Sequence, residues 1–270
     1  FSYLPSKERF WDYIIIVNSS LVSDARVALS IISIMILLLW FRISYRYLSN
    51  SYSSLVLIIS PPVIDVAFSG IRNGLSWALL FYILFVLRAR ARYILCIFPV
   101  YIHVTSLIPI LFYVILVPFL KGTHNGRLLI FSCLFFPGLI IASVSIYGFV
   151  NIMDFMDDGR DITYLQRGSG FNKVSFWIIL FFLFHKSYYK IWSIEVLRPI
   201  AIVAFNLISF TIVVSFFIPW SERIIGVSSI LLVPLVANFN KLDRLLFLSL
   251  FFVWNMVLFS YWTPIMSFFK

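Results

Sequence analysis

The stretch SPPVIDVAFSGIRNGLSWALLFYILFVLRARARY, residues 60–93, is a long apolar run that carries charged and polar residues at a few defined places. Arg72, Asn73 and Gly74 interrupt the run, and Asp65 precedes them by seven residues. An arginine at the centre of a membrane-spanning helix costs about 2.5–3.5 kcal/mol, so an arginine inside such a run is a candidate functional residue. We therefore expect Arg72 to lie at the rim of a membrane and to serve a function there, and we expect Asn73-Gly74 to let the backbone turn tightly beside it.

The composition of the chain predicts a polytopic membrane protein. Of its 270 residues, 62% are hydrophobic and 12% are charged, whereas soluble domains carry about 25% charged residues. The net charge of +10 comes from short basic clusters between apolar segments, which is typical of membrane connectors and not of a nucleic-acid-binding surface. Cys96 and Cys133 lie in predicted spans, which argues against a structural disulfide.

We expect a single all-α transmembrane domain over residues 1–270, with about eight to ten spanning or re-entrant helices. The expected spans are 25–43, 53–69, 71–87, 93–120, 128–150, 173–192, 197–218, 223–239 and 245–264. The chain begins at Phe1 and shows no cleavable signal, so we expect the natural N-terminus, with or without further helices, to lie upstream.

The segment 93–120 decides the expected topology, because it is too long for one straight pass and three prolines interrupt it, with His103 near its middle. If it is a hairpin, twelve basic residues share one face, and if it crosses once, the bias vanishes. The twelve are Arg42, Arg46, Arg88, Arg90, Arg92, Lys121, Arg127, Lys186, Lys190, Arg198, Lys241 and Arg244. The positive-inside rule favours the hairpin, with the basic face in the cytoplasm. Residues 1–24, the corner 65–72 and the loop 151–172 then lie outside.

Three short polar motifs open apolar runs in this chain. Ile71-Arg72-Asn73-Gly74 opens one, His103-Val104-Thr105-Ser106 opens another with His103 placed 31 residues after Arg72, and Glu222-Arg223-Ile224 opens a late span. Upstream, KERFWDY contains Glu8 and Phe10 as in a Glu-Pro-Gly-Phe element, but with the single residue Arg9 in place of Pro-Gly. In these motifs, over roughly residues 8–235, the chain resembles the EpsG family of polysaccharide polymerases.

The resemblance implies a Wzy-type glycosyltransferase of the bacterial cytoplasmic (inner) membrane. Such proteins join oligosaccharide repeat units carried on undecaprenyl pyrophosphate into O-antigen, a part of lipopolysaccharide, or into exopolysaccharide. A sugar hydroxyl of one repeat attacks the anomeric carbon of another, and the lipid pyrophosphate leaves. Fixed arginines suit the departing pyrophosphate, and a histidine or carboxylate suits the base.

Two sets of residues are candidates for this chemistry. The catalytic candidates are Arg72, His103, Asp65 and Arg223, and the substrate-binding candidates are Asn73, Arg160, Tyr164, Arg167, Trp220 and Glu222. The expected partners are the undecaprenyl-pyrophosphate-linked oligosaccharide and membrane lipids, with a chain-length regulator left open and no nucleic acid. No Gly-rich nucleotide loop occurs in the sequence.

Most of these candidates also have a structural interpretation. Arg72 could reach lipid phosphates as an interfacial arginine, and Asp65 could form a structural ion pair with it. His103 could bond a backbone carbonyl inside the protein. Trp220 could anchor a helix end at the interface, the commoner role of such a residue, instead of stacking on a sugar ring.

The loop 151–172 carries four acidic residues at the spacing of one helical face: Asp154, Asp157, Asp158 and Asp161. Such oxygen ligands suit Mg²⁺ or Ca²⁺, but nothing in the loop resembles a dedicated cation site. Four like charges on one face repel, so the loop needs a cation, needs Arg160 and Arg167 as partners, or forms no helix; a solvated loop without a helix is favoured. We therefore expect no metal and no other cofactor.

Two other classes of function remain open. A flippase or transporter of the same lipid-linked glycan would need similar cations but no base, and the internal repeats common in transporters do not occur here. Another transferase that uses the same carrier, such as an O-antigen ligase or an acyltransferase, is the third class.

Overall fold

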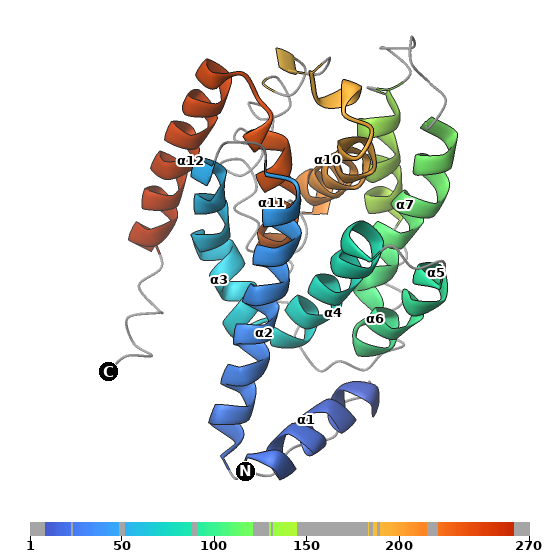
Figure 1. Cartoon of the computed structure of the whole chain (residues 1–270), viewed down its shortest axis with the longest axis vertical. Coiled ribbons are helices and arrows are strands. Elements are labelled where there is room, and N and C mark those ends of the chain that lie inside the picture. The colour runs from blue at the N-terminus through green and yellow to red at the C-terminus, as the bar shows by residue number, and fades with distance from the viewer. Residues whose placement is uncertain are drawn as a thin grey trace.

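The computed structural model describes residues 9–22, 24–48, 52–87, 91–120, 130, 132–144, 183, 186–187, 190–214 and 221–261. About 90% of the structure is helical, and no strand occurs among these residues, which confirms the all-α class for the described part of the chain. Figure 1 shows the helices gathered into one body, with the N-terminal end of α2 and the neighbouring α1 at its lower end.

The described part of the chain contains both short and long helices. They are α1 (Arg9–Leu21), α2 (Ala25–Arg46), η1 (Tyr52–Ile59), α3 (Pro61–Phe68), α4 (Ile71–Phe81), η2 (Tyr82–Val86), α5 (Arg92–Leu95), α6 (Ile97–Ile102), η3 (Val104–Ser106), α7 (Leu107–Leu120), α10 (Leu197–Val214), α11 (Ser221–Ala237) and α12 (Lys241–Tyr261). A further apolar helix covers Ser132–Val144. Here η1 and η3 are 3₁₀-helices and η2 is a π-helix.

Two of the described helices are long and apolar enough to cross a membrane, namely Arg26–Arg46 and Leu197–Val214. A third would be α3 joined to Ile71–Val86, if that bent pair forms one span. In α10 78% of the apolar window is buried inside the protein, against 39% in α2. The α10 helix is therefore central, and α2 turns much of its surface outward.

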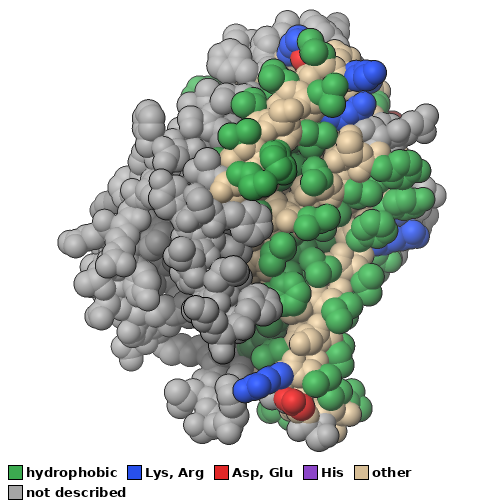
Figure 2. Space-filling model, turned by 90° about the vertical axis from the view of Figure 1, so that its left-hand side faces the viewer, with side chains coloured by type: hydrophobic (Ala, Val, Ile, Leu, Met, Phe, Trp, Pro, Cys, Tyr) green, Lys and Arg blue, Asp and Glu red, His purple; other side chains and the backbone are tan. Residues whose placement is uncertain are grey.

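The outward surface of the described helices is strongly apolar. In Figure 2, hydrophobic side chains cover most of the described part of one face, and Lys and Arg gather toward its upper end. The exposed apolar residues include Leu38 of α2 and Leu242, Leu245, Phe252 and Val253 of α12. Large exposed apolar patches are typical of surfaces that face a membrane or a partner.

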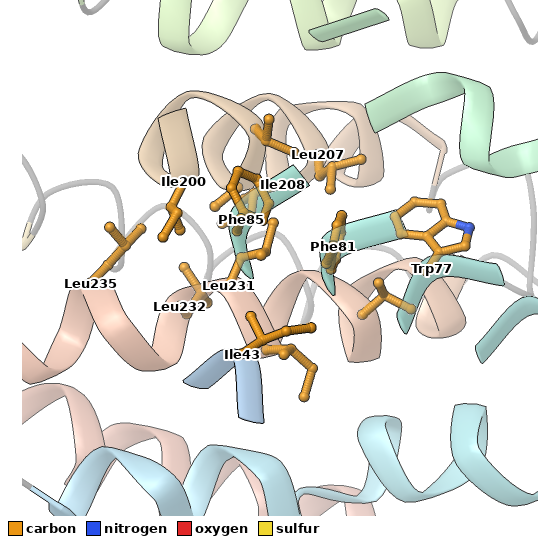
Figure 3. Packing of buried hydrophobic residues seen from close by; sticks show 14 of the residues in the cluster. Ile43, Trp77, Phe81, Phe85, Ile200, Leu207, Ile208, Leu231, Leu232 and Leu235 are labelled. Atoms are coloured by element: carbon orange, nitrogen blue, oxygen red, sulfur yellow. The ribbon is translucent and has the colours of Figure 1, made fainter. Parts of the chain in front are cut away.

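The core lies where α2, α4, α10 and α11 meet. Figure 3 shows Trp77 and Phe81 of α4 near Leu207 and Ile208 of α10, with Leu231 of α11 beside them. These side chains are at most 1% exposed. Where these side chains would otherwise be exposed to water, their burial stabilises the packing of α4 against α10 and α11 by about 25 cal/mol per Å² of apolar surface. Inside a bilayer, close packing of the side chains stabilises the same arrangement of helices.

The expected span 53–69 is wrong as a continuous helix. The chain forms the 3₁₀-helix η1, breaks at Ser60, and starts again as the eight-residue helix α3. Ser60 is extended, with ψ 148°, because the ring of Pro61 disfavours the helical conformation of the residue before it. Pro61 and Pro62 then occupy the first turn of α3, where no backbone N–H is needed.

The segment 93–120 is broken, although its prolines do not make the break. Pro99 and Pro109 lie near the starts of α6 and α7, and Pro118 lies within α7. The helices are interrupted at Cys96, between α5 and α6, and more sharply at His103, which is extended with φ −158° and ψ 123°. Whether the two arms return to one face or cross once stays a prediction.

Other expected boundaries differ by a few residues or fall partly outside the described residues. Helices α11 and α12 begin at Ser221 and Lys241, somewhat before the expected 223 and 245. The helix α1 was not expected, because residues 1–24 were interpreted only as an outer segment. Most of the expected span 173–192 lies outside the residues that the structure describes.

Candidate functional site

Arg72 lies at a sharp corner between two helices. The pair α3 and Ile71–Val86 bends by 105° at a short break. The carbonyl oxygen of Asp65 accepts the backbone N–H groups of Ser69 (2.8 Å) and Gly70 (3.0 Å), which ends α3, and Gly70 is the N-cap of α4. The direction of the chain therefore changes at Ser69 and Gly70, just before Arg72.

Gly74 has a different role from the one that the sequence suggested. It lies inside α4 and not in the turn. A Cβ added to Gly74 would lie only 2.6 Å from the carbonyl oxygen of Val66, so the missing side chain lets α4 approach α3 closely. The glycine of the Ile-Arg-Asn-Gly motif therefore lets α3 and α4 pack closely on the two sides of the corner.

Positive and negative groups both lie at the corner: the N-terminal end of α4 and Arg72 are positive, and the carboxylate of Asp65 is negative. Arg72 is half-buried in the first turn of α4, where backbone N–H groups already create a positive potential. A cation is disfavoured at this end of a helix, unlike at its C-terminal end. An arginine at this position is therefore better stabilised when an anionic group binds beside it.

Asp65 is held by the last turn of its own helix. The hydroxyl of Ser69 lies within hydrogen-bonding reach of both the Asp65 carboxylate and the Asp65 carbonyl oxygen. Asp65 is half-buried and Ser69 is exposed. The carboxylate therefore lies at the end of α3 just before the corner, and its pairing with Arg72 stays a prediction.

A hydrogen-bond network joins the two motifs that carry the resemblance. Thr105 Oγ1 donates to Asn73 Oδ1 (3.0 Å) and accepts the indole N–H of Trp77 (3.1 Å). Asn73 is 7% exposed and Trp77 is fully buried. One hydroxyl thus uses its donor and one acceptor position to link the start of α4 to the residues just after His103.

A second contact fixes the other side of the break at His103. Ser76 Oγ donates to the carbonyl oxygen of Pro99 (2.7 Å), which also accepts the backbone N–H of His103 (2.9 Å). The carbonyl oxygen of His103 accepts the N–H (3.1 Å) and the hydroxyl (2.9 Å) of Ser106. Backbone groups that the break would leave without a helical partner are satisfied within the protein, as an apolar surrounding requires.

The start of α11 packs against α3, the helix that carries Asp65, and the close contact is made by Gly226, just after the first turn of α11. A Cβ added to Gly226 would lie 2.2 Å from the carbonyl oxygen of Pro62, so α11 and α3 are in direct backbone contact. Glu222 and Arg223 belong to this first turn, but their side chains lie outside what the structure describes.

The remaining predicted residues lie outside the described part of the chain. They are Arg160, Tyr164, Arg167, Trp220 and the four acids Asp154, Asp157, Asp158 and Asp161. Among the residues that are described, no group of three or more His, Cys, Asp and Glu side chains could hold a metal ion.

The network includes residues that the sequence did not single out as functional. Ser76 and Trp77 follow Asn73 at the i+3 and i+4 positions, so all three share one face of α4. This spacing of polar atoms inside an apolar helix is the signal that could have identified them. Thr105 belongs to the quoted motif, but nothing in its position along the chain indicated its partners.

Comparisons of this chain with protein-family models, with curated proteins and with solved structures give no match. The resemblance to the polysaccharide polymerases therefore rests on the short motifs alone.

Proposed function

We propose that this protein is a multi-pass glycosyltransferase of the bacterial cytoplasmic membrane that polymerises undecaprenyl-pyrophosphate-linked oligosaccharide repeats at the outer face. The observation that carries the proposal is the hydrogen bond between Thr105 and Asn73, which unites two motifs 32 residues apart in one place. A corner that carries Arg72 at the positive end of a helix, next to a broken apolar helix that contains a histidine, suits a reaction in which a pyrophosphate departs.

In the proposed reaction, a hydroxyl oxygen of the acceptor repeat forms a bond to the anomeric carbon of the donor. The bond from that carbon to the pyrophosphate oxygen breaks, and the electron pair leaves with the lipid pyrophosphate. Arg72, with Arg223 as a second cation, binds the departing group. His103 or Asp65 takes the hydroxyl proton.

The sugar-binding part of the proposal uses residues around this centre. Asn73 would contact substrate beside Arg72, with its side-chain oxygen already held by Thr105. Arg160, Tyr164, Arg167, Trp220 and Glu222 complete the set proposed to contact substrate. Neither a nucleotide nor a metal takes part in the proposed step.

The test is polymerisation by the purified protein on a defined lipid-linked repeat. We expect Arg72→Ala to lower the rate on the order of 10²–10³-fold, as removal of a group that stabilises transition-state charge does elsewhere. Arg72→Lys should retain part of the activity, because a lysine keeps the charge and loses the forked donors. Arg42→Ala removes an exposed arginine of α2 and is the matched control.

His103→Ala should also stop the growth of long chains, with protein levels unchanged. Normal chain-length ladders from both the Arg72 and His103 variants would remove those residues from the site. In cells that lack the gene, single-repeat glycan supports the polymerase. Loss of surface repeats would instead indicate a flippase, and polymer stranded on its carrier would indicate a ligase.

A further inference from the structure

The helix α1 presents an apolar face that no described part of the protein covers. Its outward residues are Phe10, Tyr13, Ile16, Val17 and Leu21, and two of them, Tyr13 and Leu21, are 66% and 77% exposed. The opposite side carries the buried Trp11, and α1 packs there against α2 and α6. A helix that packs on its protein with one apolar side and turns further apolar side chains outward needs another apolar medium there.

The position of α1 is fixed by contacts at the foot of α2. The side-chain amide of Asn18 donates to the carbonyl oxygen of Ala28 (3.2 Å), in the first turn of α2. Figure 1 shows α1 extending obliquely from the lower end of α2 toward α6. A helix tied to the end of an apolar spanning helix in this way lies along the membrane boundary if α2 crosses the membrane.

Like α1, the helix α2 carries a stripe of exposed apolar side chains on its outward side. Val27, Ile31, Ile34 and Leu38 are exposed along α2 at helical spacing. Asp24, the N-cap of α2, and Arg26, in the first turn of α2, are both exposed and mark the level at which charge is tolerated. The two apolar surfaces therefore meet at a charged turn, as expected where a bilayer core gives way to its headgroups.

The polar residues of α1 are arranged for a surrounding that is poor in water. Ser20, on the outward side, donates its hydroxyl to the carbonyl oxygen of Val17 (2.7 Å), and Ser19 donates to that of Ile16 (3.0 Å). Each hydroxyl is thus satisfied by its own helix. Tyr13 offers an apolar ring with a polar tip, a residue type enriched at membrane interfaces.

We infer that α1 is an interfacial helix whose outward face is immersed in the lipid of the leaflet at that end of the molecule. The partner of this surface is the acyl-chain and headgroup boundary of a bilayer. Because α1 also packs against α6, the lipid boundary lies beside the arm that ends at His103. This inference stands independently of the proposed reaction.

The experiment uses the full chain with Cys96→Ala and Cys133→Ala, reconstituted in phosphatidylcholine vesicles. A single fluorescent label is attached through Ile16→Cys on the outward face, and through Ile15→Cys, one residue away on the protein side, as the matched control. Lipids brominated near the headgroup or near the chain end, and aqueous iodide, are the three quenchers.

We expect the label at position 16 to be quenched several-fold more by lipid brominated near the headgroup than by lipid brominated near the chain end or by iodide. The label at position 15 should respond weakly to all three. Dominant quenching by iodide would place the face in water, and dominant quenching near the chain end would place α1 inside the bilayer core. Quenching by none would mean that protein covers the face, and each of these three results would overturn the inference.

If the variant at position 16 is not recovered as folded protein, Val17→Cys provides the same readout on the same face. A label introduced through Ile34→Cys, in the middle of the α2 stripe, should show the opposite order of the two brominated lipids. It therefore calibrates depth within the same molecule.

Discussion

At the scale of single residues, the site depends on one hydroxyl. Thr105 binds Asn73 and Trp77 at once, so it sets how far the start of α4 lies from the break at His103. Hydrogen bonds between helices in membranes average only about 0.6 kcal/mol. The network therefore contributes more to geometry than to stability, and we assign Thr105 to the positioning of the site.

Replacing Thr105 tests this assignment. Thr105→Val keeps the volume but removes the hydroxyl, which leaves the Trp77 N–H and the Asn73 oxygen without this partner. We expect the polymerisation rate constant kcat to fall more than KM changes, and Thr105→Ser to restore it. Rates measured with the purified protein, together with its thermal unfolding in detergent, separate this outcome from simple destabilisation. Equal loss of activity in both variants would contradict a role for the hydroxyl.

At the scale of helices, close backbone approach organises the protein. The helix Ser132–Val144 meets α10 at Gly138, where an added Cβ would lie 2.2 Å from the carbonyl oxygen of Asn206. The Asn206 side chain accepts the Gly138 N–H (2.9 Å) and donates to the carbonyl oxygen of Cys133 (3.0 Å). Small residues and buried amides are the usual means of holding helices together where lipid replaces water.

Gly138→Ala should therefore lower stability. The new methyl group meets backbone atoms, which cannot rotate away as a side chain would, and overpacking of this kind costs about 1–3 kcal/mol. The midpoint of thermal unfolding in detergent should fall clearly below that of the parent protein. Ser143→Ala, at an exposed position of the same helix, is the control and should unfold with the parent. An unchanged midpoint for Gly138→Ala would mean that the two helices do not touch there.

At the scale of the whole molecule, apolar surface and charge together define an orientation. The start of α2 carries Asp24 and Arg26, and the start of α12 carries Lys241 beside the exposed Leu242. The positive-inside rule assigns Lys241 to the cytoplasm and the start of α2 to the outside.

Single cysteines test this orientation. In the background without Cys96 and Cys133, Asp24→Cys should react with a membrane-impermeant maleimide in intact spheroplasts. Leu242→Cys should react only in inverted vesicles or after permeabilisation. Reaction of both cysteines from the same side would show that the two positions lie on one side of the membrane, which contradicts the expected topology.

The sequence alone was sufficient for several features that depend on local pattern, although it missed the break before Pro61 and the helix α1. The apolar content specified a helical protein, the start of α4 falls at Ile71 as predicted, and the motif at His103 coincides with a break. These features are local, because apolar periodicity and backbone preferences act over a few residues.

Only the tertiary structure decided which distant residues meet. The partners Asn73 and Thr105 are 32 residues apart, and Gly138 and Asn206 are 68 apart. No period or motif connects such pairs, because their contact results from how whole helices pack. The same holds for Gly74, whose place along the chain suggested a turn and whose function is close approach. Chain pattern determined the helices, and the packing of polar and small residues between them determined the site.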